Sequence, residues 1–514
     1  MTDLDLRPAA GASAATAALS SAGSRPDKKI PALSPQALAV AEKPAAAPLS
    51  PIVLAGVVRM AEFALIVLVG LGVFAAYPPL AGLVPLYSGA TLVIAILAML
   101  AFQIADIYQI QAFRGVEKQY FRLASAWSVV FLIAIGLSFF AKAGQEFSRV
   151  WLAAFYVLGL VALIIERKAW FYAVRHWTRQ GRLTRRTVIV GGGEAGGRVI
   201  EELKSQKDSG VEIIGMFDDR GDERSQAEIA GERKLGTVED LVEFGRRTRV
   251  DLVVFSLPIS AENRILQMLK KLWVLPVDIR LAAHNTKLRF RPRAYSYIGS
   301  VPVIDVVDRP IADWDVVMKW LFDKMIGGLM LLCALPVMAL VALAIKLDSK
   351  GPVFFKQKRY GFNNDLIEVY KFRSMYADMA DARADRLVTK DDPRVTRVGR
   401  FIRKTSLDEL PQLINVVIKG NLSLVGPRPH AVNAKAETRL YDDAVDGYFA
   451  RHRVKPGITG WAQVNGWRGE TDTQEKIQRR VEHDLHYIEN WSVLFDLAIL
   501  LRTPIALLKT ENAY

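Results

Sequence analysis

Five long apolar stretches constrain the fold of this chain more than any other feature of its sequence. One of them spans residues 325–345, and the other four lie close together, around residues 57–74, 87–102, 123–140 and 150–165. Each of these four is close to the roughly 20 residues that an α-helix needs to cross a bilayer. We therefore expect an α/β membrane protein in which residues 49–170 form a bundle of four transmembrane helices.

Basic residues predict the orientation of this bundle. The connection at residues 75–88 has no Lys or Arg, whereas basic residues follow both the second and the fourth stretch. The positive-inside rule therefore puts both ends of the bundle in the cytoplasm. The connection with Lys142 and Arg149 fits this orientation least well, and Glu62, near the start of the first stretch, is expected at the membrane interface.

Residues 1–48 have the composition of an unfolded segment. They are rich in Ala, Ser and Pro, and they lack the basic start and the apolar core of a secretion signal. We therefore expect a disordered cytoplasmic tail.

The formal net charge of +14 indicates an anionic partner, which could be nucleic acid, an anionic lipid surface or a phosphorylated substrate. Charge alone does not choose among these three. The single cysteine, Cys333, excludes an internal disulfide and a zinc site built on cysteines.

Residues 185–310 have the pattern of a Rossmann-like α/β domain. Gly191, Gly193 and Gly196 match G-x-G-x-x-G between a predicted strand and a predicted helix, and Asp218 ends the next strand, where a ribose-binding acid would lie. The pattern is consistent with nucleotide binding, because small residues let a phosphate approach the positive end of a helix. The alternative is that the glycines only allow a helix and a strand to pack closely.

The fifth apolar stretch, residues 325–346, contains Pro336 near its middle, and lysines flank both of its ends. Proline removes a helical hydrogen bond and bends the axis. After four spans, a fifth crossing would also move the rest of the chain to the far side of the membrane. We therefore predict a kinked, re-entrant helical hairpin that returns to the cytoplasmic face, with an ordinary transmembrane helix as the alternative.

Two adjacent acids, Asp408 and Glu409, stand in the segment "KTSLDELPQLINVVIKGNLSLVGPRP". Ser406 and Glu409 fit a helix capping box, but Pro411 would then be the fifth helical residue, where proline is unfavourable. A helix that starts near Asp408 fits better, and its positive end would favour an ionised carboxylate and an incoming phosphate.

Basic residues are predicted to approach these acids from several segments. Lys371 and Arg373 alternate with aromatic residues in "YKFRSM", so both would share one face of a strand. Arg403 precedes the acids and Arg428 follows them in "GPRP". Together the residues suggest phosphoryl transfer, in which one carboxylate attacks phosphorus and the other holds Mg²⁺. The alternative for the two acids is that they only cap a helix and form salt bridges. Lys356, Lys358 and Arg359 form a further basic group, for which the alternative to substrate binding is a solvated face near lipid headgroups.

From about Lys319 to Tyr514 the chain resembles the bacterial sugar transferases known as polyprenyl-phosphate glycosyl-1-phosphate transferases, and we expect residues 315–514 to form the catalytic domain. The resemblance rests on "GPVFFKQKRYG", "YKFRSM", "DPRVTRVGRFIRKTSLDELPQLINVVIKGNLSLVGPRP", "VKPGITGWAQVNGWRGETDT" and "HDLHYIENWSVLFDLAILLRT". With four preceding helices and a Rossmann-like module, the chain is similar to the large branch of that family, which initiates exopolysaccharide, capsule or O-antigen repeat units at the bacterial inner membrane.

The resemblance implies a mechanism with named residues. Asp408 would attack the sugar-bearing phosphate of a UDP-sugar and expel UMP, and undecaprenyl phosphate would then collect the phosphosugar from Asp408. Glu409 would bind Mg²⁺, and Arg403 would hold phosphate. Further family positions match Arg428, Asp484 and Asp496, which we assign to substrate binding; for the last two the alternative is a surface acid on an interfacial helix.

The donor sugar is inferred from finer resemblance. The "WRGETDT" extension and the terminal "NAY" are similar to the branch that transfers glucose 1-phosphate from UDP-glucose, with galactose or another hexose as the alternative. Sugar or uridine contacts are expected at Trp461, Trp467 and Arg468. For the two tryptophans, the alternative is that they anchor the domain at the membrane interface. The chain departs from the family at two positions. Leu335 stands where Ser usually precedes the hairpin proline, and Trp320 follows Lys319 where relatives often have Arg after Lys.

Two other classes of function share part of this sequence pattern. Membrane-bound nucleotide-sugar dehydratases share the first half of the pattern, but their chemistry needs Tyr-x-x-x-Lys, and no tyrosine here has a lysine four positions on. A non-catalytic membrane scaffold or nucleotide sensor would leave the acid pair without a purpose. The resemblance makes nucleic acid an unexpected partner. For the Rossmann-like domain, regulatory nucleotide binding and a homodimer interface both stay open.

Overall fold

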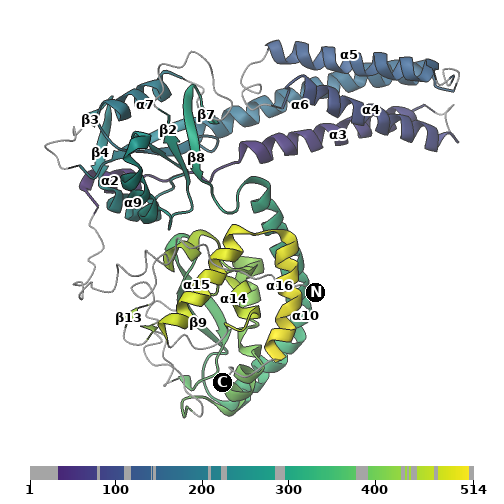
Figure 1. Cartoon of the computed structure of the whole chain (residues 1–514). Coiled ribbons are helices and arrows are strands. Elements are labelled where there is room, and N and C mark those ends of the chain that lie inside the picture. The colour runs from purple at the N-terminus through teal and green to yellow at the C-terminus, as the bar shows by residue number, and fades with distance from the viewer. Residues whose placement is uncertain are drawn as a thin grey trace, which may run out of the picture.

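The computed structural model describes residues 33–77, 82–108, 117–140, 142, 146–206, 210–220, 228–283, 296–377, 392–429, 435–436, 439–440, 448–467 and 473–508. Expectations for residues 1–32, for Arg468 with the extension up to Asp472, and for the terminal "NAY" lie outside these residues. Figure 1 shows three parts in the chain: a group of long helices, an α/β domain, and a mixed domain that carries the acid pair.

The long helices coincide with the first four apolar stretches and pack side by side (Figure 1). They are α3 (Pro51–Ala75), α4 (Val84–Ile104), α5 (Glu117–Phe140) and α6 (Arg149–Arg179). With α10 (Asp313–Asp348) they make five helices, among the described residues, that are long and apolar enough to cross a membrane. Small residues bring them close: a Cβ at Gly159 of α6 would lie 2.6 Å from the ring of Trp127 in α5.

Glu62 is not at an interface in the structure. Its side chain is fully buried between α3 and α6, where Oε1 lies 2.5 Å from a guanidinium nitrogen of Arg167. The sequence expectation counted Arg167 only as a cytoplasmic charge after the fourth stretch. In the fold, the two charges compensate each other, which is what allows both to be buried.

The α/β domain is built on an eight-stranded sheet of order β3-β4-β2-β1-β5-β6-β8-β7. Its strands are β1 (Arg185–Val190), β2 (Val211–Phe217), β3 (Glu228–Ile229), β4 (Glu232–Gly236), β5 (Leu252–Phe255), β6 (Asp278–Ala282), β7 (Ser296–Ile298) and β8 (Val301–Val307). The five from β4 to β6 in this order pair in parallel, and the outer pairs are antiparallel. The parallel-sheet domain predicted from the sequence is therefore confirmed.

Helices cover this sheet because its central strands are apolar on both faces. They are α7 (Glu194–Ser205), α8 (Val238–Arg247) and α9 (Glu262–Leu272), with the 3₁₀ turn η3 (Ile259–Ala261) before α9. In β1, Val188 and Val190 belong to one buried cluster and Ile189 to the other, as the two-residue period of a strand requires.

Part of the expected disordered tail is ordered in the structure. Residues 35–41 form α2 (Pro35–Ala41), in which Ser34 accepts a capping hydrogen bond from the amide of Ala37 and donates to the carbonyl of Leu235. Leu33 and Ala37 are buried against the α/β domain. The expectation was wrong for this stretch because its composition hid a Ser-Pro helix start and two apolar residues at helical spacing.

The third part begins with α10 and continues to α16 (Val493–Leu508), which lies beside α10 in Figure 1. Two small sheets organise it: β9 (Phe354–Tyr360) pairs antiparallel with β10 (Leu366–Phe372), and β11 (Ser423–Val425) pairs parallel with β14 (Gly457–Thr459). A separate antiparallel pair joins β12 (Lys435–Ala436) and β13 (Arg439–Leu440).

Short helical segments fill the rest of this domain. Their bounds are η4 (Phe362–Asn364), α11 (Arg397–Lys404), η6 (Leu407–Glu409), α12 (Gln412–Ile414), η7 (Asn415–Lys419), η8 (Tyr448–Arg453), α14 (Trp461–Val464) and α15 (Gln474–Glu489).

The stretch predicted as a hairpin forms one continuous α-helix, α10, with Pro336 inside it. Its first half contacts the domain through Asp323, whose Oδ1 accepts from Ser423 and from the amide of Leu424. Its end contacts the same domain through Asp348, which accepts from the amide of Val398. One position in the first third of α10 and its last residue therefore contact one globular body, whereas its first residue, Asp313, accepts a hydrogen bond from Ser50 at the start of α3.

Candidate active site

The acid pair lies in the 3₁₀ turn η6. Ser406, just before it, has a left-handed backbone (φ 58°) and makes no capping hydrogen bond with its side chain. The capping box is therefore not formed. The helical segment starts at Leu407, close to the predicted start, and Pro411 precedes the first residue of α12, where proline is well tolerated.

Asn415 fixes this helical segment against the β9–β10 hairpin. Its side chain is fully buried; it donates to the carbonyl of Glu368 (2.7 Å) and accepts from the amide of Tyr370 (2.9 Å). Because Lys371 follows directly in the strand, this contact brings the Lys371 ammonium to the acid pair.

Glu409 is held by two cations. Nζ of Lys371 and a guanidinium nitrogen of Arg428 each donate to Oε1 of Glu409, both at 2.8 Å. Burial opposes ionisation of this carboxyl, but Arg428 and Lys371 outweigh it and lower its pKa. Glu409 therefore stays ionised throughout the physiological range.

Asp408 behaves differently from its neighbour. Burial, together with the charge of Glu409, raises the pKa of Asp408 to about 6, against the lowering effect of Lys371, Arg403 and Arg428. Arg403 approaches from α11 and donates from Nε to the hydroxyl of Ser374 (3.0 Å). At neutral pH, Asp408 is mostly ionised yet more basic than an ordinary aspartate, which suits a carboxylate nucleophile.

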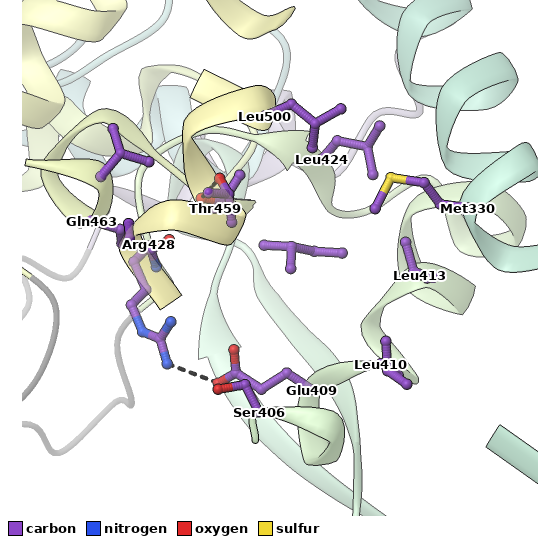
Figure 2. Close-up of a pocket in the computed structure, with 14 residues that line it drawn as sticks. Met330, Ser406, Glu409, Leu410, Leu413, Leu424, Arg428, Thr459, Gln463 and Leu500 are labelled. Carbon is purple, nitrogen blue, oxygen red and sulfur yellow. Dashed lines mark hydrogen bonds and ion pairs between the residues drawn. The ribbon is translucent and has the colours of Figure 1, made fainter. Parts of the chain in front are cut away.

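An apolar cavity of about 190 Å³ opens beside this pair. In Figure 2, Glu409 and Arg428 form its polar end, and leucine side chains and Met330 of α10 lie around the rest. The full lining is Met330, Ser406, Glu409, Leu410, Leu413, Leu424, Arg428, Ile458, Thr459, Gln463, Val464, Leu500, Thr503 and Ala506. The cavity thus joins the charged site to the apolar helices α10 and α16.

Arg373 was expected to bind phosphate, but its guanidinium is buried at the end of α10. It donates to the carbonyls of Lys350 (2.6 Å) and Ser349 (2.8 Å). Ser349 is the C-cap residue of α10 and Lys350 follows it, so Arg373 caps the C-terminal end of this helix. Of the two "YKFRSM" cations, the structure brings only Lys371 to Glu409.

Asp484 and Asp496, predicted as substrate-binding residues, are both buried in ion pairs. Asp484 accepts from Arg451 (2.6 Å), which also donates to the backbone carbonyl of Arg428 (2.8 Å). Asp496 accepts from Lys319 (2.5 Å) and from the hydroxyl of Tyr487 (2.7 Å). Neither acid is on a solvated face, so the alternative of a surface acid does not hold. Both acids bind basic side chains of the domain, and Asp484 is linked to the site through Arg451.

In the α/β domain, the backbone at the three motif glycines shows why two of them need a positive φ and one needs close packing. A Cβ at Gly196 would lie 2.5 Å from the carbonyl oxygen of Gly191, and both Gly191 and Gly193 have a positive φ. Asp218 is buried, and its carboxylate accepts from the amides of Gly192 (2.7 Å) and Arg220 (3.0 Å). These contacts favour the packing alternative over a ribose contact from Asp218.

The tryptophans expected near the sugar have neighbours within the domain. The ring of Trp461 packs on Phe495, and the carbonyl of Trp467 accepts from Arg480. Neither tryptophan lines the cavity, although Gln463 and Val464, which follow Trp461 in α14, do.

The residues present are compatible with Mg²⁺. Among the described residues no group of three His, Cys, Asp or Glu could hold a metal. Mg²⁺ usually takes one or two carboxylates and completes its octahedron with water and substrate phosphates. The two adjacent acids, of which Glu409 points one carboxylate oxygen into the cavity in Figure 2, match this donor set.

Sequence reasoning missed several residues of the site. Arg359 was grouped with Lys356 and Lys358, but its guanidinium donates to the carbonyl of Pro429. The period of two along β9 would have separated it from the two lysines, which are exposed. No local sequence pattern predicted the roles of Arg451 and Lys319, because they bind the carbonyls of Arg428 and Val425, which are distant in sequence.

Together, the apolar helices, the α/β domain and the acid pair ringed by cations define a membrane-associated enzyme with an anionic substrate. Comparison with protein families is consistent with this class: residues 314–510 match the bacterial sugar transferase family, and residues 103–283 match a CoA-binding domain family. The chain belongs to the bacterial sugar transferases, as its resemblance predicted.

Curated relatives cover most of the chain. A UDP-glucose:undecaprenyl-phosphate glucose-1-phosphate transferase of Escherichia coli (strain K12) is 36% identical over 82% of this chain and 90% of its own length. Its counterpart in Xanthomonas campestris pv. campestris is 34% identical over 81% of this chain and 86% of its own. An undecaprenyl-phosphate glucose phosphotransferase of Komagataeibacter xylinus is 39% identical over 68% of this chain and 64% of its own.

Proposed function

We propose that this protein transfers glucose 1-phosphate from UDP-glucose to undecaprenyl phosphate and thereby starts the assembly of an exopolysaccharide or capsule repeat unit. The observation that carries the proposal is the adjacent pair Asp408 and Glu409, of which Glu409 is held by Lys371 and Arg428 at the polar end of an apolar cavity between α10 and α16. The names of the relatives support the two substrates.

The first half-reaction uses Asp408 as nucleophile. A carboxylate oxygen of Asp408 bonds to the sugar-bearing phosphorus, the bond from that phosphorus to the bridging oxygen breaks, and UMP leaves with the bridging oxygen. Arg428 and Lys371 lie where they can offset charge on the phosphate oxygens, and Arg403 adds a third cation. The product is an acyl phosphate between Asp408 and the sugar phosphate.

The second half-reaction regenerates Asp408. A phosphate oxygen of undecaprenyl phosphate bonds to the same phosphorus, the bond to the Asp408 oxygen breaks, and the lipid diphosphate sugar leaves. The apolar lining suits the hydrocarbon end of this substrate, since Leu410, Leu413 and Leu500 lead from the acids toward α16. When bound by Glu409, Mg²⁺ would neutralise charge on the diphosphate.

We further propose that α10 enters the membrane and returns to the cytoplasmic face of the inner membrane instead of crossing it. Asp323, in the first third of α10, and Asp348, its last residue, contact the same domain, and a helix that crossed the bilayer between them could not keep both contacts. The side chains between them include exposed Leu332, Leu335 and Leu340, which suit a lipid environment. The four helices α3–α6 would then be the crossing spans.

The test is UMP release by the purified protein in detergent or nanodiscs, with Mg²⁺, undecaprenyl phosphate and UDP-glucose. UDP-galactose, at the same concentration, is the comparison. We expect UMP release with UDP-glucose as the donor and none with UDP-galactose. Equal release from both donors would replace glucose by a broader hexose specificity, and no release from any UDP-hexose would favour the non-catalytic scaffold or sensor.

A further inference from the structure

Arg359 lies on the inner face of strand β9. Its two basic neighbours in the strand, Lys356 and Lys358, are exposed on the other face. The guanidinium of Arg359 donates from Nε (3.2 Å) and Nη2 (2.6 Å) to Oε1 of the buried Gln357, and from Nη1 to the carbonyl of Pro429. Gln357 therefore orients the guanidinium, and its remaining nitrogen reaches the Gly-Pro-Arg-Pro turn.

The carbonyl that Arg359 holds belongs to the residue directly after Arg428. Arg428 in turn contacts Glu409 through its side chain, at 2.8 Å. The backbone of the same turn is also held by Arg451, which donates to the carbonyl of Arg428. Two consecutive carbonyls, of Arg428 and Pro429, are thus bound by two different cations.

The start of the turn is held in the same way. The carbonyl of Val425, at the end of β11, accepts from Nζ of Lys319 (2.9 Å) and from the hydroxyl of Tyr487 (3.0 Å). Asp496 and Asp484 organise the donors at the two sides of the turn. Among these donors, Arg359 is the one that comes from the strand hairpin that also carries Lys371, the second partner of Glu409.

Arg359 also lines a small polar hollow next to Glu409. The hollow has a volume of about 10 Å³, room for about one water, and Lys371, Gln412 and Arg428 share its wall. Burial and the charge of Arg428 lower the pKa of Arg359 to about 10, so it is charged at neutral pH and adds a positive group to Lys371, Arg403 and Arg428 near the acid pair.

We propose that Arg359 is a positioning residue: it fixes the Arg428–Pro429 turn so that the guanidinium of Arg428 stays on Glu409 beside the nucleophile. The inference rests on the proposed function for its kinetic consequence. A planar guanidinium suits the task, because it bonds Gln357 and Pro429 at once in a fixed geometry, which the single ammonium of a lysine does not reproduce.

The kinetic test is a double-mutant cycle. Arg359→Gln is expected to lower kcat about 10- to 100-fold with less than about a threefold change in KM for UDP-glucose, and Arg359→Lys to recover part of the loss. In an Arg428→Gln background, Arg359→Gln is expected to cost less than about threefold, because the residue through which it acts is gone. Lys358→Gln, one position away on the exposed face, is the matched control and is expected to keep wild-type kinetics.

Equal losses in both backgrounds, or a change confined to KM, would overturn the proposal. A merely structural role would lower the yield or the midpoint of thermal unfolding without this coupling. If the wild type uses another UDP-hexose, the cycle is measured with that donor, so the sugar assignment and the role of Arg359 fail separately.

Hydrogen–deuterium exchange tests the same role without turnover. Arg359→Gln is expected to speed exchange at least about fivefold in the peptide from Leu424 to Arg428, whereas Lys358→Gln leaves it unchanged. Unchanged exchange in Arg359→Gln would sink the proposal even if no donor were turned over by the wild type.

Discussion

Nζ of Lys371 lies 2.8 Å from Oε1 of Glu409, and Arg428 donates to the same oxygen, so that two adjacent acids differ in their chemical state. Glu409 has its pKa lowered by Arg428 and Lys371 against the effect of burial, whereas burial raises the pKa of Asp408 to about 6. Pairs whose environments drive their pKa values apart are a common basis for two distinct roles. Here the more basic acid suits attack, and the permanently ionised one suits a metal.

Asp408→Asn is expected to abolish UMP release and to stabilise the folded protein at neutral pH. A raised carboxyl pKa means that the native state favours the protonated form, so stability from this group is present at low pH and is lost as pH rises through about 6. Removing the charge should recover on the order of 1 to 2 kcal/mol at pH 7.5. Thermal unfolding of the detergent-solubilised protein measures this.

The control for that variant is Glu368→Gln, an exposed acid on β10. It should change neither stability nor turnover. A destabilised Asp408→Asn, or one that still releases UMP at more than a few per cent of the wild-type rate, would contradict the assignment of Asp408 as a half-buried nucleophile.

The pH dependence of the wild-type rate follows from the same shift. Only ionised Asp408 can attack, so kcat/KM for the donor should be constant above pH 7 and fall about tenfold per unit well below the pKa of about 6. Initial rates between pH 5 and 8, with enzyme stability verified at each pH, measure this limb. A limb near pH 4, as for an ordinary aspartate, would argue against a raised pKa of the half-buried Asp408 carboxyl.

The rate of UMP release should depend on Mg²⁺, and Glu409 should be the residue that binds the ion. A chelator should stop UMP release by the wild type and added Mg²⁺ should restore it, because the two acids offer the oxygen ligands that this ion prefers. Glu409→Gln should need a higher Mg²⁺ concentration and lose about 100-fold or more in kcat at saturating metal. Full activity of the wild type in excess chelator would remove Mg²⁺ from the site.

Much of the fold was readable from the sequence because its signals are local. Apolar length predicted α3 to α6, and the strand-glycine-helix pattern predicted the α/β domain with its parallel sheet. The helical start near Asp408 and the approach of Arg428 were also expected. These signals need only a window of neighbours and the rules of burial and backbone freedom.

The remaining features depend on contacts between distant segments. The roles of Arg373 as a helix cap, and of Asp484 as a partner of Arg451, depend on which elements pack together, and a charge in the sequence does not name its partner. Arg359 was misread for the opposite reason: it was grouped with two neighbours that its strand turns to the other face. α2 was not predicted because the Ala-, Ser- and Pro-rich composition of this stretch indicated disorder, although Leu33 and Ala37 are buried against the α/β domain.

The buried pair between α3 and α6 gives a last prediction, about the stability of the helices. Glu62→Gln should destabilise the protein by roughly 3 to 5 kcal/mol, because it leaves Arg167 buried without its charge partner. The double variant Glu62→Leu with Arg167→Met should recover much of that loss, since paired apolar side chains of similar size need no compensation. Thermal unfolding of both variants in the same detergent measures the difference. Arg149→Met, at the start of α6 and exposed, is the matched control and should unfold like the wild type. If Glu62→Gln unfolds like the control, the charges are solvated instead of paired, and α3 and α6 do not pack as closely as their side chains indicate.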